Sequence, residues 1–172
     1  MVAPWASALA GLVALQMHGV GMGPVAAQSA AAVWELDCKP ISGEARMGCV
    51  ARTTLISRGA GGTALRIDVV PAGALGNADA VLRVFLPHGV ALNANLGVQI
   101  DGGEVYKIPL MTSDRDGVTA IQFIGADVVK KLRNGNALQV TAVTPQGDTA
   151  ANSVSLVGLT LALDSASRLM EP

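Results

Sequence analysis

Apolar and polar side chains alternate along most of the chain after residue 33, and this period of two constrains the fold most. In residues 65–69 the apolar side chains would share one face of an extended strand, while Arg66 and Asp68 would face water. The other predicted strands cover residues 33–38, 48–57, 80–86, 97–101, 104–110, 118–124, 136–143 and 153–157. Gly- and Pro-rich turns separate them at intervals of about 8–12 residues, which is typical of a sandwich or barrel. We therefore expect an all-β fold, mainly an antiparallel β-sandwich.

One segment departs from this period and predicts a short helix at residues 126–134. An apolar stripe that includes Val128 and Leu132 recurs at helical spacing, and basic residues near its end favour the helix dipole. Gly135 follows as a candidate left-handed stop. For residues 160–170, a second helix and irregular structure are both open.

The first 27 residues differ in composition from the rest of the chain. They contain no Asp, Glu, Lys or Arg, carry an apolar run at residues 9–15, and end in small residues before Gln28. This pattern predicts a secretory signal peptide cleaved after Ala27. The run is too short and too broken by Gly for a membrane span, and charged residues interrupt every later apolar stretch. We expect residues 28–172 to form a single β-sandwich domain in the periplasm, at the cell surface or in the medium.

Bulk composition excludes one class of partner. The chain has 12 basic and 13 acidic residues, a formal net charge of −1 and a pI of about 6.1. This balance lacks the basic footprint of a nucleic-acid-binding protein. Aromatic residues make up only 3% of the chain, so the core is expected to consist of Val, Leu, Ile and Ala.

The two cysteines, Cys38 and Cys49, are expected to form a structural disulfide, because export places them in an oxidising compartment. A redox-active pair usually has the closer C-x-x-C spacing. Zinc binding is poorly supported, since His88 is the only histidine after the predicted signal peptide. His88 lies in a Pro-His-Gly turn and is expected to be a surface residue, without the nucleophile and carboxylate of a catalytic triad.

Trp34 would share a strand face with Leu36 and Cys38, which predicts a core ring packed against the disulfide. An exposed Trp34 beside Tyr106 would instead indicate a binding patch. From the sequence, a buried and an exposed Trp34 ring are both open. The buried ring is preferred because a fully exposed Trp is uncommon.

The most charged loop contains Ser113, Asp114, Arg115 and Asp116. It lacks the later bidentate Glu of an EF-hand, and its Asp-Gly pair favours a solvated hairpin loop. We take these four residues, within the loop at residues 111–118, as a candidate interaction site, together with the loop at residues 88–96. The glycine-rich stretch at 59–62 lacks the Lys-Ser or Lys-Thr pair of a P-loop and predicts a hairpin connection.

Three spaced blocks carry a family resemblance. The first is Trp34-Glu35-Leu36-Asp37-Cys38 with Cys49; the second is Leu86-Pro87-His88-Gly89-Val90-Ala91-Leu92 followed by Ile100-Asp101-Gly102; the third is Leu132 with Asn134-Gly135, then Ser155-Leu156-Val157-Gly158-Leu159-Thr160-Leu161-Ala162-Leu163. In this order the blocks resemble the invasion-associated locus B family of exported bacterial proteins. The resemblance covers residues 34–163.

The resemblance implies a periplasmic or surface-associated protein of Gram-negative bacteria with a link to host-cell invasion, and it transfers no catalytic residue. It also implies structural positions in the core, at Trp34, Leu36, Pro87, Gly89 and Gly158. The family's second Cys pair is missing. Ser113 and Val118 stand at its two positions, which marks the chain as a divergent member.

These observations favour a non-enzymatic envelope or secreted module that binds a protein partner in the envelope or on a host cell, with no cofactor and no metal site. The alternative is a hydrolase or isomerase that uses carboxylates such as Asp101, Glu104, Asp114 or Asp116. A third hypothesis is a structural protein of the envelope.

Overall fold

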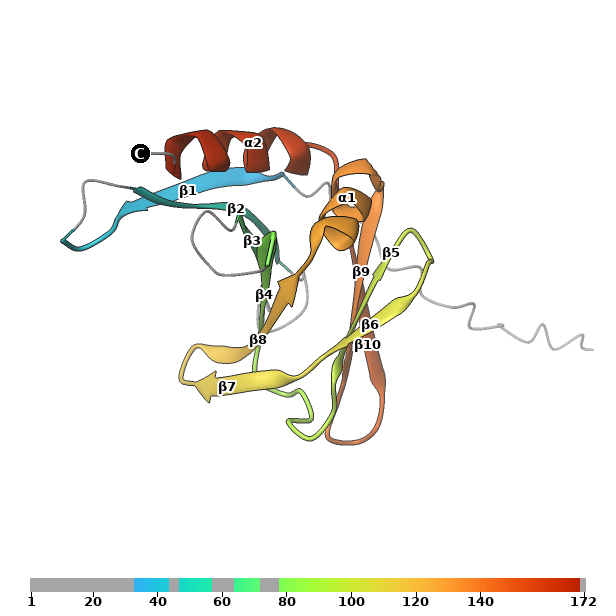
Figure 1. Ribbon diagram of the computed structural model, residues 1–172. Coiled ribbons are helices and arrows are strands. Elements are labelled where there is room, and N and C mark those ends of the chain that lie inside the picture. Colours follow the sequence, from blue (N-terminus) through green and yellow to red (C-terminus); the bar gives the residue numbers. More distant parts are fainter. Residues whose placement is uncertain (1–32, 44–46, 57–63, 72–77, 171–172) are drawn as a thin grey trace, which may run out of the picture.

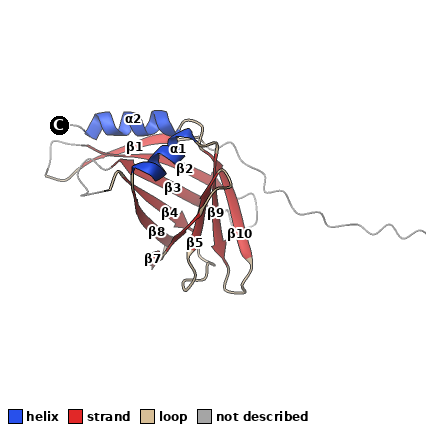
Figure 2. Ribbon diagram, turned by 45° about the vertical axis from the view of Figure 1, so that its right-hand side comes forward, coloured by secondary structure: helices blue, strands red, loops and turns tan. Residues whose placement is uncertain are grey.

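Two antiparallel sheets face each other, and two helices lie at one end of them (Figures 1 and 2). The structure is a computed structural model that describes residues 33–43, 47–56, 64–71 and 78–170. The predicted signal peptide at 1–27 and the glycine-rich stretch at 59–62 lie outside these residues. The predicted fold class, a mainly antiparallel β-sandwich, is confirmed.

The larger sheet has six strands in the order β1-β2-β3-β4-β8-β7. Their bounds are β1 Glu35–Pro40, β2 Met47–Ile56, β3 Ala64–Pro71, β4 Ala80–Leu86, β7 Leu110–Asp114 and β8 Gly117–Ile124. The smaller sheet has four strands in the order β10-β9-β5-β6. Their bounds are β5 Leu96–Ile100, β6 Val105–Ile108, β9 Ala137–Val143 and β10 Thr149–Ser155. All neighbouring strands in both sheets pair antiparallel.

The core lies between the inner faces of the two sheets. In strand β3, Ile67 and Val69 are fully buried in this core, as the alternation predicts. Asp68 between them was expected to face water but is 1% exposed, because Arg52, Arg66 and Arg83 surround it on the other face of the sheet. From the smaller sheet, Leu138 and Val140 of β9 reach the same core. As the composition predicts, this interior is almost entirely aliphatic.

Helix α2 (Leu159–Met170) packs against β1, β2 and β3 and lies along that end of the larger sheet (Figure 2). Leu159, Ala162, Leu163 and Ala166 are buried, at the i, i+3, i+4, i+7 spacing of one helix face. Of the two structures left open for residues 160–170, the helix is therefore the one that forms.

Helix α1 (Ala126–Asn134) has the predicted bounds, and Leu132 is its buried residue. The prediction for Gly135 was wrong, because its backbone is extended (φ −79°, ψ 166°) and not left-handed. Gly135 is needed for close packing instead. A Cβ there would lie 2.9 Å from Cγ2 of Ile100 and 2.9 Å from the carbonyl oxygen of Lys131.

The predicted strand at residues 104–110 is two strands in different sheets. Strand β6 ends at Ile108 and β7 begins at Leu110, so the chain passes from the smaller to the larger sheet at Pro109 (Figure 1). Pro109 lies outside both strands and has no backbone N–H to donate to either sheet. The last predicted strand, 153–157, is also corrected. Strand β10 covers Thr149–Ser155, and its first four residues are exposed.

The disulfide Cys38–Cys49 joins residues directly opposite each other in the β1–β2 pair, with 4.1 Å between the Cα atoms. Trp34, just before β1, is buried. Leu36 was expected in the core but is 38% exposed. Strand β1 is the outermost strand of its sheet, so its side chains have a neighbouring strand on one side only.

The remaining motif positions are turn residues more than core residues. Pro87 is half-buried, while Gly89 and Gly158 are exposed and have φ angles of +100° and +93°. Only glycine adopts this left-handed conformation without strain, so both glycines are required by the backbone and not by the core. Among the described residues, no helix is long and apolar enough to cross a membrane.

Candidate functional site: an apolar cavity between the sheets

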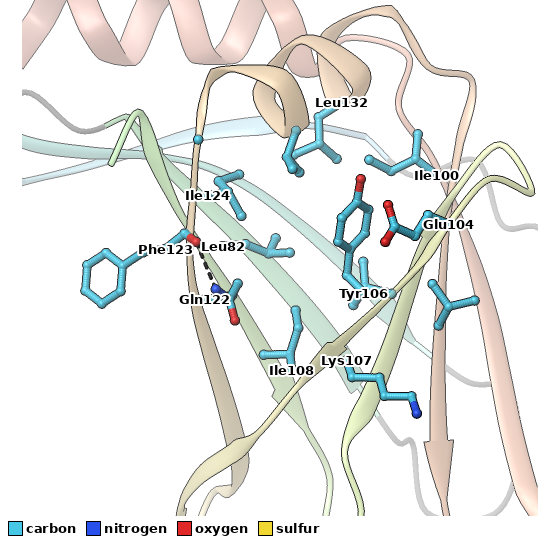
Figure 3. A pocket seen from close by; sticks show the side chains of 14 residues that line it. Leu82, Ile100, Glu104, Tyr106, Lys107, Ile108, Gln122, Phe123, Ile124 and Leu132 are labelled. Carbon is cyan, nitrogen blue, oxygen red and sulfur yellow. Dashed lines mark hydrogen bonds between the residues drawn. The ribbon is translucent and has the colours of Figure 1, made fainter. Parts of the chain in front are cut away.

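A cavity of about 390 Å³ lies between the two sheets, below helix α1 (Figure 3). Strands β4 and β8 form one wall, β5 and β6 form the other, and α1 contributes the roof. Its apolar lining side chains are Leu82, Val98, Ile100, Val105, Ile108, Ile124, Val128 and Leu132. Cavities of a few hundred Å³ with apolar walls and a few polar groups are typical ligand sites.

The cavity opens at a seam between two strand edges. Strand β7 pairs with β8 only from Gly117 to Ala120, so residues 121–124 of β8 have no strand partner on that side within the described chain. Strand β6 is the edge of the smaller sheet and faces the same seam. The seam exists because the chain changes sheets at Pro109 and β6 diverges from β8 above this point (Figure 1).

Gln122 is a polar side chain on the inner face of β8, where Val118, Ala120 and Ile124 are apolar and buried. Its Nε2 donates a hydrogen bond of 2.9 Å to the backbone carbonyl of Phe123. The ring of Phe123 points away from the cavity and is 60% exposed (Figure 3). The side-chain amide of Gln122 thus makes the hydrogen bond to this carbonyl that a backbone N–H of a neighbouring strand would otherwise make.

Tyr106 enters the cavity from β6, across from Gln122 (Figure 3). Its hydroxyl accepts a 2.8 Å hydrogen bond from Nζ of Lys131 on α1. This hydrogen bond is the main cause that raises the pKa of Lys131, and the nearby charges of Glu104 and Asp127 add to it. Tyr106 and Glu104 also line a second hollow of about 280 Å³. The Tyr106–Lys131 contact therefore ties β6 to α1 between two hollows.

The predicted interaction loop is exposed. Ser113 and Asp114 end β7, Arg115 and Asp116 form the turn to β8, and the carboxylate of Asp114 accepts a 2.8 Å hydrogen bond from the backbone of Asp116. Nε2 of His88 lies 3.3 Å from the carbonyl oxygen of Arg115. The structure thus brings the two predicted loops, 88–96 and 111–118, side by side, away from the cavity lining.

The four carboxylates of the alternative enzyme hypothesis lie at two separate hairpins. Asp101 and Glu104 flank the β5–β6 turn, whereas Asp114 and Asp116 lie at the β7–β8 turn (Figure 1). Asp101 already accepts hydrogen bonds from the backbone N–H groups of Asn136 and Ala137, at 2.8–3.0 Å. These bonds, with the one from Ala137 first, lower the pKa of Asp101. Within the described chain no three His, Cys, Asp or Glu side chains group as metal ligands.

A charged cluster lies on the outer face of the larger sheet. Asp68 is 1% exposed and pairs with Arg52 at 2.8 and 2.9 Å, while Arg66 and Arg83 each approach it to 3.7 Å. Arg52 also binds Asp37. The hydrogen bonding that Arg52 donates to the carboxylate of Asp68 is the main cause that raises the pKa of Arg52. The cluster holds β1 to β4 together across the outer face, which makes it a structural feature.

The family model for invasion-associated locus B protein matches residues 34–167. The chain belongs to the invasion-associated locus B family. It is also similar to the crystal structure of invasion-associated protein B from Bartonella henselae, with 20% sequence identity and a TM-score of 0.66. That match covers 82% of this chain and 95% of the other chain, and it shows the fold. No curated protein sequence matches the chain.

Membership in the invasion-associated locus B family gives the three sequence blocks a structural meaning. Trp34 of the first block donates a hydrogen bond to the carbonyl of Ser155 in the third, and Asp101 of the second accepts one from the backbone N–H of Asn136, which follows Gly135 of the third. Gly135 of the third block packs against Ile100 of the second. The blocks therefore connect parts of the fold, and they do not line up as a catalytic site.

From the sequence, Gln122 was not a candidate, Lys131 was only one of the basic residues near the end of the predicted helix, and Tyr106 was considered only as a neighbour of Trp34. Two signals pointed toward this region. Gln122 interrupts the apolar alternation of residues 118–124, and Pro109 interrupts the predicted strand at 104–110. Together they mark a strand with an unpaired edge and a place where the chain leaves the sheet.

Proposed function

We propose that this chain is an exported, non-catalytic binding module whose ligand enters the seam cavity. The observation that carries the proposal is the cavity itself, because it has apolar walls and opens between two strand edges. Two of its polar groups already make hydrogen bonds, the hydroxyl of Tyr106 with Lys131 and the amide of Gln122 with a backbone carbonyl. This arrangement suits binding by shape and burial of apolar surface.

A catalytic function has less support. The invasion-associated locus B family is not known as an enzyme family, and the carboxylates considered for acid–base chemistry are divided between two hairpins. Asp101 is engaged in holding the start of β9. We therefore rank the hydrolase or isomerase hypothesis below the binding module.

Residues 1–27 are proposed to be a signal peptide, and residues 28–172 a single domain in the periplasm, at the cell surface or in the medium. Membership in a family of exported proteins and the Cys38–Cys49 disulfide support this destination. The mass of the protein recovered from cell fractions tests it. Cleavage after Ala27 and oxidised cysteines are expected, whereas intact chain with free thiols in the cytosol would contradict it.

Site-specific photo-crosslinking in living cells tests the binding function. Val105 at the cavity rim is 51% exposed, and Val157, outside the cavity lining, is 76% exposed and serves as the matched control position. A photoreactive residue at 105 is expected to give discrete adducts that the same residue at 157 does not. Equal adduct patterns at both positions would contradict a ligand site at the seam.

The partner is proposed to belong to the envelope or to a host cell, in keeping with the family's association with invasion. Deletion of the gene for this chain distinguishes a role in host-cell invasion from a role in the envelope. Reduced host-cell entry with normal detergent resistance supports a link to invasion. The opposite result supports the hypothesis of an envelope-stability protein.

A further inference from the structure

The free edge of β8 at the seam is the starting point. The carbonyl oxygen of Ile124 accepts a hydrogen bond from the backbone of Asp79, beside β4. Successive residues of a strand direct their backbone groups to opposite edges, so the carbonyl of Phe123 points to the edge that β7 leaves uncovered. Gln122 binds this carbonyl with its own side chain. The side-chain amide of Gln122 therefore stands where a backbone N–H of an added strand could donate to the carbonyl of Phe123.

The cavity lies directly beside this edge. Leu82, Ile108 and Leu132 belong to its lining, and all three are buried apolar side chains (Figure 3). A strand added next to residues 121–124 would direct alternate side chains toward this cavity and the others toward solvent. The geometry is that of a sandwich with room for one further short strand at the place where β6 diverges from β8.

The charged side chains at the seam indicate which kind of ligand can bind there. Lys131 is hydrogen-bonded to Tyr106, and the ammonium group of Lys107 points away from the cavity (Figure 3). Glu104 lies at the rim. An inserted charge would lose hydration against the apolar walls that Leu82, Ile108 and Leu132 form, so the side chains inserted there must be apolar.

We infer that the seam binds an extended, uncharged segment of a partner protein by strand addition to β8 at residues 121–124. In the complex a backbone N–H of the segment replaces the Gln122 amide at the carbonyl of Phe123, and alternate apolar side chains fill the cavity. Main-chain hydrogen bonds supply affinity and the cavity supplies selectivity, as in other cases of strand addition. This inference rests on the proposed binding function and names its mode.

The test uses the full-length chain and a blocked hexapeptide of alternating Thr and Val, compared with the same peptide N-methylated at every second residue. N-methylation removes backbone donors and keeps the side chains. Saturable binding by calorimetry is expected for the first peptide and at least about tenfold weaker binding for the second, the loss of roughly one well-formed hydrogen bond. Hydrogen exchange at residues 121–123 is expected to slow on binding.

A matched pair of variants tests the replaced hydrogen bond. Gln122→Leu removes the competing amide and is expected to tighten binding of the plain peptide by about threefold or more. Gln99→Leu removes a similar contact, the 2.7 Å bond from Gln99 to the carbonyl of Gly103, and is expected to leave binding unchanged. Tighter binding in both variants, or in neither, would overturn the inference.

Other occupants give different results. Equal binding of the plain and methylated peptides would indicate an apolar ligand site without strand addition, and a dimer that Gln122→Leu alters would indicate a second copy of the chain. Either result overturns the inference. Adducts at position 105 would still support the binding function in those cases, and their absence would count against the function itself.

Discussion

The indole Nε1 of Trp34 donates a 2.8 Å hydrogen bond to the carbonyl oxygen of Ser155, 121 positions away in the sequence. This bond joins the start of β1 to the end of β10, and so connects the larger sheet to the smaller one. Trp34 also belongs to the buried core. One side chain thus provides both apolar burial and a polar link between the sheets.

Trp34→Phe is expected to lower the free energy of unfolding by about 1–2 kcal/mol, because the carbonyl of Ser155 loses its donor and some apolar area is lost. Urea unfolding followed by circular dichroism measures the change. Val157→Ala is the control, since Val157 is 76% exposed and should change stability by less than about 0.5 kcal/mol. Equal effects of both substitutions would show that the hydrogen bond contributes nothing measurable.

Asp68→Asn is expected to destabilise the protein by about 3 kcal/mol, because it removes the buried carboxylate that faces Arg52, Arg66 and Arg83. Asp37→Asn should cost less, since Asp37 is 30% exposed and pairs with Arg52 alone. Thermal unfolding of the two variants measures the difference. If Asp37→Asn had the larger effect, the buried carboxylate would not be the centre of the cluster.

Ser113 and Val118 are cross-strand partners in the β7–β8 hairpin, as Cys38 and Cys49 are in the β1–β2 hairpin. The double variant Ser113→Cys with Val118→Cys is therefore expected to form a second disulfide. A loop of this length should add about 2 kcal/mol by the chain-entropy model. A mass loss of two further hydrogens and a higher unfolding midpoint measure it. The midpoint should fall back on selective reduction of this bridge, and free thiols in the purified variant would contradict the register.

The stability of the folded protein is expected to depend on pH through Asp101. Its pKa is lowered in the folded protein from the ordinary value of 3.8, because the carboxylate accepts hydrogen bonds from the backbone of Ala137 and Asn136. A lowered pKa contributes stability that is fully present above the unfolded value and is lost as the pH falls through the folded value. Urea midpoints measured from pH 6 to below pH 3 should fall less steeply in Asp101→Asn than in the unchanged chain. Parallel curves would contradict the assignment.

The fold class could be predicted from the sequence because burial of one face of a strand makes apolar side chains recur at every second residue. Strand β4 (Ala80–Leu86) and helix α1 (Ala126–Asn134) have the predicted bounds for this reason. The pairing of Cys38 with Cys49 followed from compartment, and the structure contains the bond. The family resemblance could also be recognised from the sequence, because most residues within each block are neighbours in the chain.

The cavity was not predictable in the same way, because it depends on where strands stop pairing. Periodicity placed residues 104–110 in one strand, and only the three-dimensional path shows β6 and β7 in different sheets. The same holds for Asp101, which the sequence presented as a candidate acid or base. Its contact with Ala137 joins residues 36 positions apart and has no local signature. Leu36 was misplaced because a period shows which face a residue occupies and not whether that face is covered.

The cavity itself can be tested with two valines that are neighbours across β5 and β9. Val98 and Val140 are cross-strand partners with exposed fractions of 2% and 1%, but only Val98 lines the cavity. Val98→Phe should place its ring in the empty space and raise the free energy of unfolding by about 0.5–1 kcal/mol. Val140→Phe should overpack a filled part of the core and cost about 1–3 kcal/mol.

Chemical denaturation of the two variants gives the comparison, and peptide binding gives a second readout. Val98→Phe should weaken binding of the alternating Thr and Val peptide at least tenfold, by about 1.4 kcal/mol, because the ring occupies the space that the inserted side chains need. If both variants lost the same stability, the space beside Val98 would be as tightly packed as that beside Val140, and the seam would have no room for a ligand.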